Sequence, residues 1–249
     1  MKFEDIPLTR LLREERFYIL FGLAGLIALS WAYLVFWDMP MSLQAWAWPH
    51  FAMMFTMWAV MMVAMMVPSA MPMILLYSHA TRKAKTDGGN LAPLFVFISG
   101  YIVAWTGFSL LAATLHGLFE TAGIVTPMMI SSHPWLTGGL LILAGIYQMS
   151  PLKDTCLVYC SHPVQFISKY WRTGTWGVFR MGLHHGLFCV GCCWALMMLL
   201  FVGGVMNLLW VAALAIFVLL EKVLPLPKRW GVISGGVLIL AGLYLGVSG

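Results

Sequence analysis

Long apolar stretches, separated by short polar segments, run along almost the whole chain. A helix needs about 20 apolar residues to cross the hydrocarbon core of a membrane. Stretches near or above that length occupy residues 17–37, 50–76, 92–119, 134–152, 178–202, 205–222 and 230–247. The pattern predicts an all-α, polytopic membrane bundle of seven transmembrane helices, with residues 1–249 as one integral membrane domain. The charged segment 1–16 is predicted to be amphipathic and to lie on the cytoplasmic side.

Composition supports the membrane interpretation. Of the 249 residues, 61% are hydrophobic and 9% are charged, whereas a soluble domain has about 25% charged residues. The net charge of +5 raises the question of nucleic-acid binding. However, the basic segments are short and lack interleaved aromatic residues, so no nucleic-acid partner is expected. We expect the protein to lie in the lipid bilayer, and the sequence does not decide whether it forms an oligomer.

Basic residues fall in or beside alternate connecting segments only. Of the 14 Lys and Arg residues, 12 lie before the first stretch or between the second and third, the fourth and fifth, and the sixth and seventh, and Arg180 and Lys222 lie at the ends of stretches that border these connections. The other connections, 38–49, 120–133 and 203–204, and the C-terminus have none. By the positive-inside rule, the N-terminus is predicted to be cytoplasmic and the C-terminus periplasmic in a bacterial inner membrane. On this view Glu221 and Lys222 form a local pair at the interface.

Two short sequences occur twice. Trp58-Ala-Val-Met-Met62 resembles Trp194-Ala-Leu-Met-Met198, and the segment 138–147 resembles 235–244. Each pair is three predicted spans apart, so its members would cross the membrane in opposite directions. This predicts an inverted three-helix repeat, placed at 17–119 and 134–222 with 230–247 as an extra helix. The alternative is coincidence, because small residues recur wherever helices pack in membranes.

The fifth stretch carries a line of soft ligands. Met181, His185, Cys189, Cys193 and Met197 are spaced four residues apart, so they share one face of a helix. Cys192 and His184 lie beside them, which gives a candidate metal site of Cys189, Cys192, Cys193, His184 and His185. Thiol, thioether and imidazole together favour Cu(I) over zinc, which prefers a closed tetrahedral set. The alternative is that buried cysteines act as small hydrophobic residues.

The second stretch carries methionines at the same spacing. Met57, Met61 and Met65 are candidate copper ligands, with Met57 and Met61 near the depth of Cys193. Alternatively, the methionines only fill the core, as this flexible side chain often does. Pro68 and Pro72 are predicted to break or kink the helix beyond them.

A further cluster follows the fourth stretch. Cys156, Cys160 and His162 lie close together in the sequence, just past the predicted cytoplasmic boundary, where thiols stay reduced. They are candidates for the place where a metal ion enters or leaves the protein, or for a redox sensor. The alternative is a pair of free thiols on an interfacial helix.

Three motifs together resemble a bacterial family of predicted metal-binding integral membrane proteins of unknown function. They are Met61-Met-Val-Ala-Met-Met-Val-Pro68, the segment 145–156 with Cys160, and Gly191-Cys-Cys-Trp194 followed by Glu221-Lys222. The resemblance covers the second to sixth stretches. It implies a polytopic inner-membrane protein whose metal ligands are among these cysteines.

The patterns together favour a protein that binds Cu(I) and either transports it or delivers it to a membrane enzyme. Its expected partners are a membrane enzyme complex or a copper chaperone. One alternative is a non-catalytic subunit or assembly factor of a copper oxidase or monooxygenase complex. Another is a haem or quinone redox protein. The sequence has no phosphate-binding loop, Ser/His/Asp set or paired carboxylates, so an enzyme is the less favoured class.

Overall fold

A computed structural model describes residues 8–36, 48–86, 93–124, 133–224 and 229–248. Within these ranges the chain is helical and contains no strand. The helices are α1 (Leu8–Phe36), α2 (Trp48–Thr86), α3 (Leu94–Thr121), α4 (Pro134–Gln148), α5 (Pro151–Ser161), α6 (Pro163–Tyr170), α7 (Gly174–Met198), α8 (Leu200–Gly203), α9 (Leu208–Val223) and α10 (Arg229–Ser248). The all-α fold is therefore confirmed. The predicted amphipathic segment 1–16 lies partly outside the described residues.

Five helical stretches are long and apolar enough to cross a membrane. They are Ile19–Phe36, Trp48–Thr81, Leu94–Thr121, Gly174–Gly203 and Arg229–Val247. A sixth crossing results if α4 and α5, which are bent by 66° relative to each other, form one broken span. These helices are compatible with a membrane protein. The prediction of seven spans is not confirmed, because α9 has only 16 residues and falls short of the usual spanning length.

The fourth predicted span, 134–152, ends earlier than expected because the chain turns at Ser150. The side chain of Ser150 accepts a hydrogen bond from the backbone N–H of Lys153, and Pro151 occupies the first turn of α5. Both features are typical of a new helix start. As a result, the chain bends after Gln148 and α5 turns toward α7.

Helix α2 runs without a break through Pro68 and Pro72, so of the predicted break or kink at these prolines the break is wrong and the kink stays a prediction. Helices in membranes tolerate proline where neighbouring groups satisfy the freed backbone. Near Pro68, at a carbonyl that neither proline frees, Met66 accepts hydrogen bonds from the Ser69 hydroxyl at 2.8 Å and the Tyr101 hydroxyl at 3.0 Å, and the second of these ties α2 to α3.

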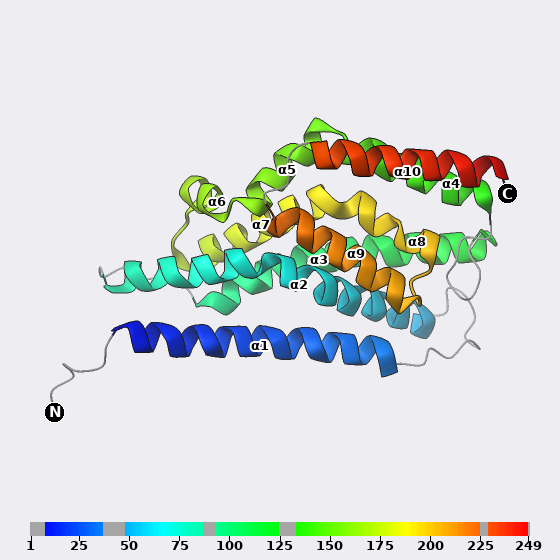
Figure 1. The fold of residues 1–249 in the computed structure, drawn as a ribbon. Helices are drawn as coiled ribbons and strands as arrows, with labels where there is room; N and C mark the ends of the chain where they lie inside the picture. Colours follow the sequence, from blue (N-terminus) through cyan, green and yellow to red (C-terminus); the bar gives the residue numbers. More distant parts are fainter. Residues whose placement is uncertain (1–7, 37–47, 87–92, 125–132, 225–228, 249) are drawn as a thin grey trace, which may run out of the picture.

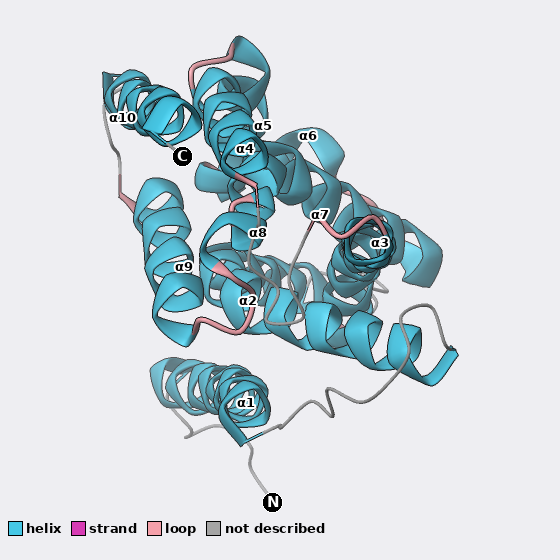
Figure 2. Cartoon of the chain, turned by 90° about the vertical axis from the view of Figure 1, so that its right-hand side faces the viewer, coloured by secondary structure: helices cyan, strands magenta, loops and turns pink. Residues whose placement is uncertain are grey.

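The long helices lie side by side and alternate in direction along the chain (Figure 1). Helices α2, α3 and α7 carry most of the buried core, while α1 packs on the outside against α2. Seen along the bundle, α1 lies at one edge, and α4 and α10 lie together at the opposite edge (Figure 2). The site described below lies among α2, α3, α5, α7 and α9.

The two glycine-containing segments that resemble each other in sequence pack on each other. A Cβ atom on Gly138 would lie 2.7 Å from the carbonyl oxygen of Gly242, and one on Gly145 would lie 2.6 Å from that of Gly235. Helices α4 and α10 therefore meet backbone to backbone through their glycine faces, as is common for helices in membranes.

Candidate thiol centre

The soft-ligand face predicted for α7 is a single buried face. Met181, His185, Cys189, Cys193 and Met197 are each exposed by 2% or less. Gly182 and Gly186 bring α3 against this helix: a Cβ atom on Gly186 would lie 3.0 Å from the carbonyl oxygen of Tyr101. This close approach carries the Tyr101 hydroxyl to 3.1 Å from the Cys189 sulfur.

The two cysteine clusters predicted separately from the sequence meet in space. Because α5 turns back toward α7, the Cys160 sulfur is buried and lies 3.8 Å from the Cys192 sulfur. All five cysteines are free thiols. Cys160 thus belongs with the α7 cysteines, and we call Cys160, Cys189, Cys192 and Cys193 the thiol centre.

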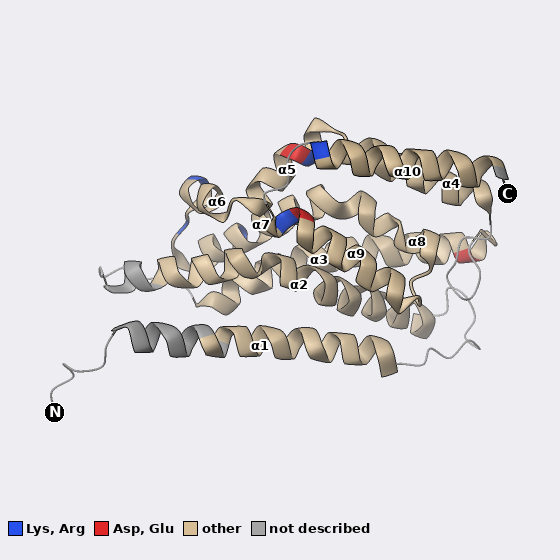
Figure 3. Ribbon diagram, viewed as in Figure 1, with Lys and Arg blue, Asp and Glu red and all other residues tan. Residues whose placement is uncertain are grey.

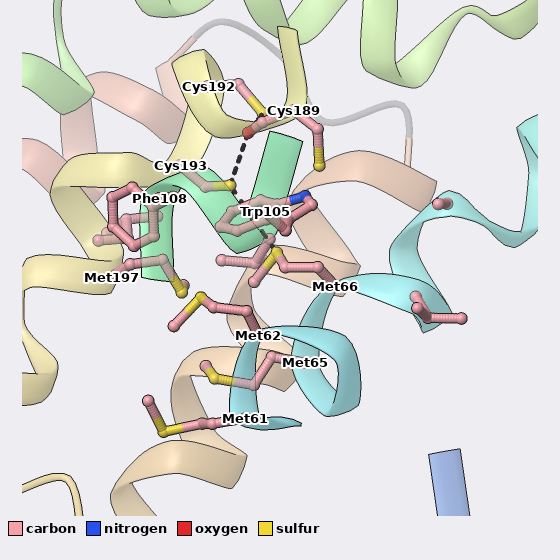
Figure 4. Close-up of a cluster of buried hydrophobic side chains, with 14 of the residues drawn as sticks. Met61, Met62, Met65, Met66, Trp105, Phe108, Cys189, Cys192, Cys193 and Met197 are labelled. Carbon is pink, nitrogen blue, oxygen red and sulfur yellow. Dashed lines mark hydrogen bonds between the residues drawn. The ribbon is translucent and has the colours of Figure 1, made fainter. Parts of the chain in front are cut away.

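Helix α2 supplies a thioether next to the thiol centre. The Cys193 sulfur lies 3.9 Å from the Met66 sulfur and donates to the Cys189 carbonyl at 2.8 Å (Figure 4). The methionine beside the cysteines is therefore Met66, which the sequence analysis did not select. Its position within the run of methionines gave no signal that distinguished it from its neighbours.

Lys222, near the end of α9, reaches into the thiol centre. It is 5% exposed, and its Nζ lies 2.9 Å from the Cys189 sulfur, 3.8 Å from the Cys193 sulfur and 3.2 Å from the Ser69 hydroxyl. The prediction that Lys222 pairs locally with Glu221 at an interface is wrong. Both residues are buried, and the charged end of α9 lies partway along the length of the bundle rather than at one of its ends (Figure 3). Helix α9 has only 16 residues, and this short length is the feature that could have indicated that Glu221 and Lys222 lie inside the bundle.

Glu221 is paired with a different lysine. Lys153 Nζ lies 2.6 and 2.7 Å from the two carboxylate oxygens of Glu221, and Gln148 Nε2 donates to the same carboxylate at 2.7 Å. Lys153 and Glu221 are 2% and 7% exposed. This network borders a cavity of about 230 Å³, whose lining also includes Asp154 and His162.

His185 lies beside the thiol centre in an aromatic environment. Its ring packs against Phe97, Tyr101 and Phe166, with ring centroids 5.1–6.1 Å away. Its Nδ1 atom is buried and has no hydrogen-bond partner among the described residues. An unsatisfied ring nitrogen at this depth is costly, so a ligand for it is chemically favoured.

Other candidate residues lie apart from these contacts. His184 faces the Tyr170 ring, with centroids 5.8 Å apart, and His162 is exposed and 3.0 Å from the Ser161 hydroxyl. Cys156 is half-buried against Gly191 of α7. Their role as metal ligands stays a prediction.

The methionines Met57, Met61 and Met65 are all buried, at 4%, 0% and 1% exposure. At about 1.5 Å per residue, Met57 lies about 13 Å along α2 from Met66. Met66, and not Met57, is therefore the methionine at the level of Cys193. Figure 4 shows Met66, Met62, Met65 and Met61 following α2 away from the cysteines. The row runs from the thiol centre toward the α2 end that begins at Trp48.

Across the described part of the chain, no three His, Cys, Asp or Glu side chains form a ready-made metal site. Within the thiol centre the Cys160 and Cys192 sulfurs lie 3.8 Å apart, and Lys222 contacts the sulfurs of Cys189 and Cys193. A metal ion that needs three or four protein ligands would require these side chains to move. An ion satisfied by two thiolates would require much less movement.

The fold and the site define an all-helical protein with several helices long enough to span a membrane and a buried centre of free thiols. Residues 55–245 match the model of the family PpoB2, described as copper chaperone, and the chain belongs to this family. No curated protein and no solved structure matches the chain. The family assignment supports the copper-related function inferred from the sequence.

Proposed function

We propose that this protein is an inner-membrane Cu(I) carrier that binds the ion at the thiol centre and transports it or delivers it to a membrane enzyme. The observation that carries this proposal is the 3.8 Å separation of the Cys160 and Cys192 sulfurs, which come from two different helices. Both thiols are buried at less than 10% exposure. Soft thiolate and thioether ligands favour Cu(I) among the common metals.

Two thiolates suffice to hold Cu(I), and neighbouring sulfurs offer the next ligands. Met66 touches Cys193 at 3.9 Å, and buried methionines continue along α2. In the proposed mechanism the ion exchanges one ligand at a time, from Cys160 and Cys192 to Cys193 and Met66, and then to Met62, Met65, Met61 and Met57. The ion stays bound to sulfur in each step, and no single site binds it so tightly that it could not move on.

The predicted membrane topology is part of this proposal. Seven crossings, an N-terminus in the cytoplasm and a C-terminus in the periplasm would require α4 with α5, and α9, each to count as one crossing. Their directions in the bundle, alternating with those of their neighbours, support this count (Figure 1). The reciprocal packing of Gly138 on Gly242 and of Gly145 on Gly235 involves α10, which lies outside the predicted repeats 17–119 and 134–222, so the inverted repeat stays a prediction.

The test is the copper content of protein purified under reducing conditions, measured by mass spectrometry. We expect about one copper ion per wild-type chain and a loss of most of it in Cys160→Ser and Cys192→Ser. Cys156→Ser is the matched control, because Cys156 lies one turn before Cys160 on α5 but is only half-buried. A wild-type protein without copper, or copper retained in both centre variants, would contradict the proposal.

Transfer distinguishes a carrier from a subunit that holds its metal permanently. Copper-loaded protein in vesicles is mixed with a Cu(I) chelator on one side of the membrane. A carrier gives up its copper to the chelator, whereas a permanent centre keeps it. A haem or quinone protein would instead show the absorption bands of its cofactor.

A further inference from the structure

Lys222 is the only Lys or Arg side chain that contacts the thiol centre in the described part of the structure, and its position is unusual for a lysine. Helix α9 ends at Val223, so Lys222 projects from its last turn into the core. The ammonium group contacts the sulfurs of Cys189 and Cys193 and the hydroxyl of Ser69. A buried ammonium group needs compensation by an opposite charge or by hydrogen-bond acceptors.

No carboxylate compensates Lys222 among the described residues. The adjacent Glu221 is engaged by Lys153 and Gln148. The groups that face the Lys222 ammonium are therefore sulfurs from α7 and a hydroxyl from α2. The positive charge therefore lies where a metal ion would have to lie to bind Cys189 and Cys193 together.

We propose that Lys222 makes the thiol centre selective for a monovalent soft cation, Cu(I), over divalent zinc. The inference rests on the proposed function, because it concerns the selectivity of the same centre. Two effects of the one side chain produce it: a limit on the number of available ligands and electrostatic repulsion.

The first effect limits the number of ligands. Zinc in structural sites is held by four ligands in tetrahedral geometry. The Lys222 ammonium lies 2.9 Å from the Cys189 sulfur and 3.8 Å from the Cys193 sulfur, so a set of four ligands that adds both of these sulfurs to Cys160 and Cys192 would have to displace it. An ion that uses two sulfurs at a time, such as Cys160 with Cys192 or Cys193 with Met66, does not. Two sulfurs satisfy Cu(I) but not zinc.

The second effect is repulsion by the fixed charge. At a given distance, a positive charge repels a divalent ion twice as strongly as a monovalent one, and the interaction is strengthened by burial. Lys222 is 5% exposed, so solvent screens it poorly. Both effects therefore disfavour zinc more than Cu(I).

The test is competition between the two metals under reducing conditions, with Cu(I) and Zn²⁺ each supplied from a buffer of known free concentration. In the wild type we expect Cu(I) to bind and an excess of zinc not to displace it. In Lys222→Gln we expect the ratio of Cu(I) to zinc affinity to fall by at least about tenfold. Lys222→Arg keeps the charge and should keep most of the preference.

A second control separates selectivity from general damage to the core. The double variant Lys153→Met/Glu221→Gln removes a neighbouring buried ion pair without leaving a single charge, and it should leave the metal preference unchanged. Each variant is first checked for monodispersity and helix content. An unchanged preference in a folded Lys222→Gln would overturn the inference.

The wild-type measurement keeps the proposal testable if Lys222→Gln does not fold. Zinc that displaces Cu(I) from the wild type would overturn this inference while leaving copper binding intact. A wild type that binds no Cu(I) would overturn the proposed function and this inference together. Cu(I) binding with an altered preference only in the charge-removing variant would support both.

Discussion

Glu221 and Lys222 are neighbours in the sequence, yet each finds its partners on other helices. Glu221 binds Lys153 of α5, whereas Lys222 contacts Cys189 of α7 and Ser69 of α2. Successive residues of a helix point about 100° apart, so one turns toward the α5 network and the other toward the thiol centre. The roles of these two charges depend on this difference in direction.

The ion pair between Lys153 and Glu221 leads to a prediction about stability. Lys153→Met leaves the Glu221 carboxylate buried without its cation, and loss of one member of a buried pair costs about 3–5 kcal/mol. Thermal unfolding of the purified protein in detergent should show a large drop in midpoint. The double variant Lys153→Met/Glu221→Gln should recover most of it, and a double variant as unstable as the single one would contradict this account.

Met66 leads to a prediction about copper movement. Met66→Leu removes the thioether next to Cys193 but conserves volume, so the change in stability should stay below about 1.5 kcal/mol. We expect the copper content to be retained, because Cys160 and Cys192 remain, and the release of copper to a chelator to slow severalfold. Met73→Leu, a buried position further along α2, is the control. Equal release rates in the two variants would argue against a path through Met66.

At the scale of helices, the packing of α4 on α10 depends on glycine at particular positions. A Cβ atom on Gly145 would lie 2.6 Å from the Gly235 carbonyl oxygen, whereas one on Gly139 of the same helix would meet no atom within 4 Å. The two glycines therefore differ in environment although both lie in one apolar helix.

This difference predicts opposite outcomes for the same substitution. Gly145→Ala should destabilise the protein by about 1–3 kcal/mol through overpacking. Gly139→Ala should be neutral or slightly stabilising, because alanine is the better helix former. Thermal unfolding of both variants in one detergent measures the difference, and equal midpoints would show that α4 and α10 do not pack as described.

At the scale of the whole molecule, the number of crossings decides on which sides of the membrane the two ends lie. Helix α1 begins at one end of the bundle and α10 finishes at the other (Figure 1). An odd number of crossings follows if this arrangement is placed across a bilayer. The distribution of the 14 basic residues then predicts that the N-terminus lies inside.

Reporter fusions test this topology. A periplasmic reporter such as alkaline phosphatase should be active when fused to the C-terminus and inactive when fused to the N-terminus. A cytoplasmic fluorescent reporter should give the reverse pattern. Both ends on one side would contradict seven crossings and would show that α9 or the α4–α5 pair does not cross.

Local sequence patterns determined the helices and one face of the site. Apolar length located the long helices, because burying a helix in an apolar environment requires a continuous run of apolar residues. It did not give all their ends, since α1 begins at Leu8 and α2 runs to Thr86. The spacing of four residues gave the buried face of α7, because it depends only on helix geometry. The class of metal followed from the ligand types, and the family assignment supports its copper-related part.

Only the tertiary structure decided which residues from different helices meet. The turn at Ser150 brings Cys160 to Cys192, the close approach at Gly186 brings Tyr101 to Cys189, and the short α9 places Lys222 in the thiol centre. None of these contacts follows from spacing, because each depends on a bend, an interhelical distance or a helix end. The candidate cysteines were therefore identified from the sequence, whereas their assembly around a buried lysine and beside Met66 required the fold.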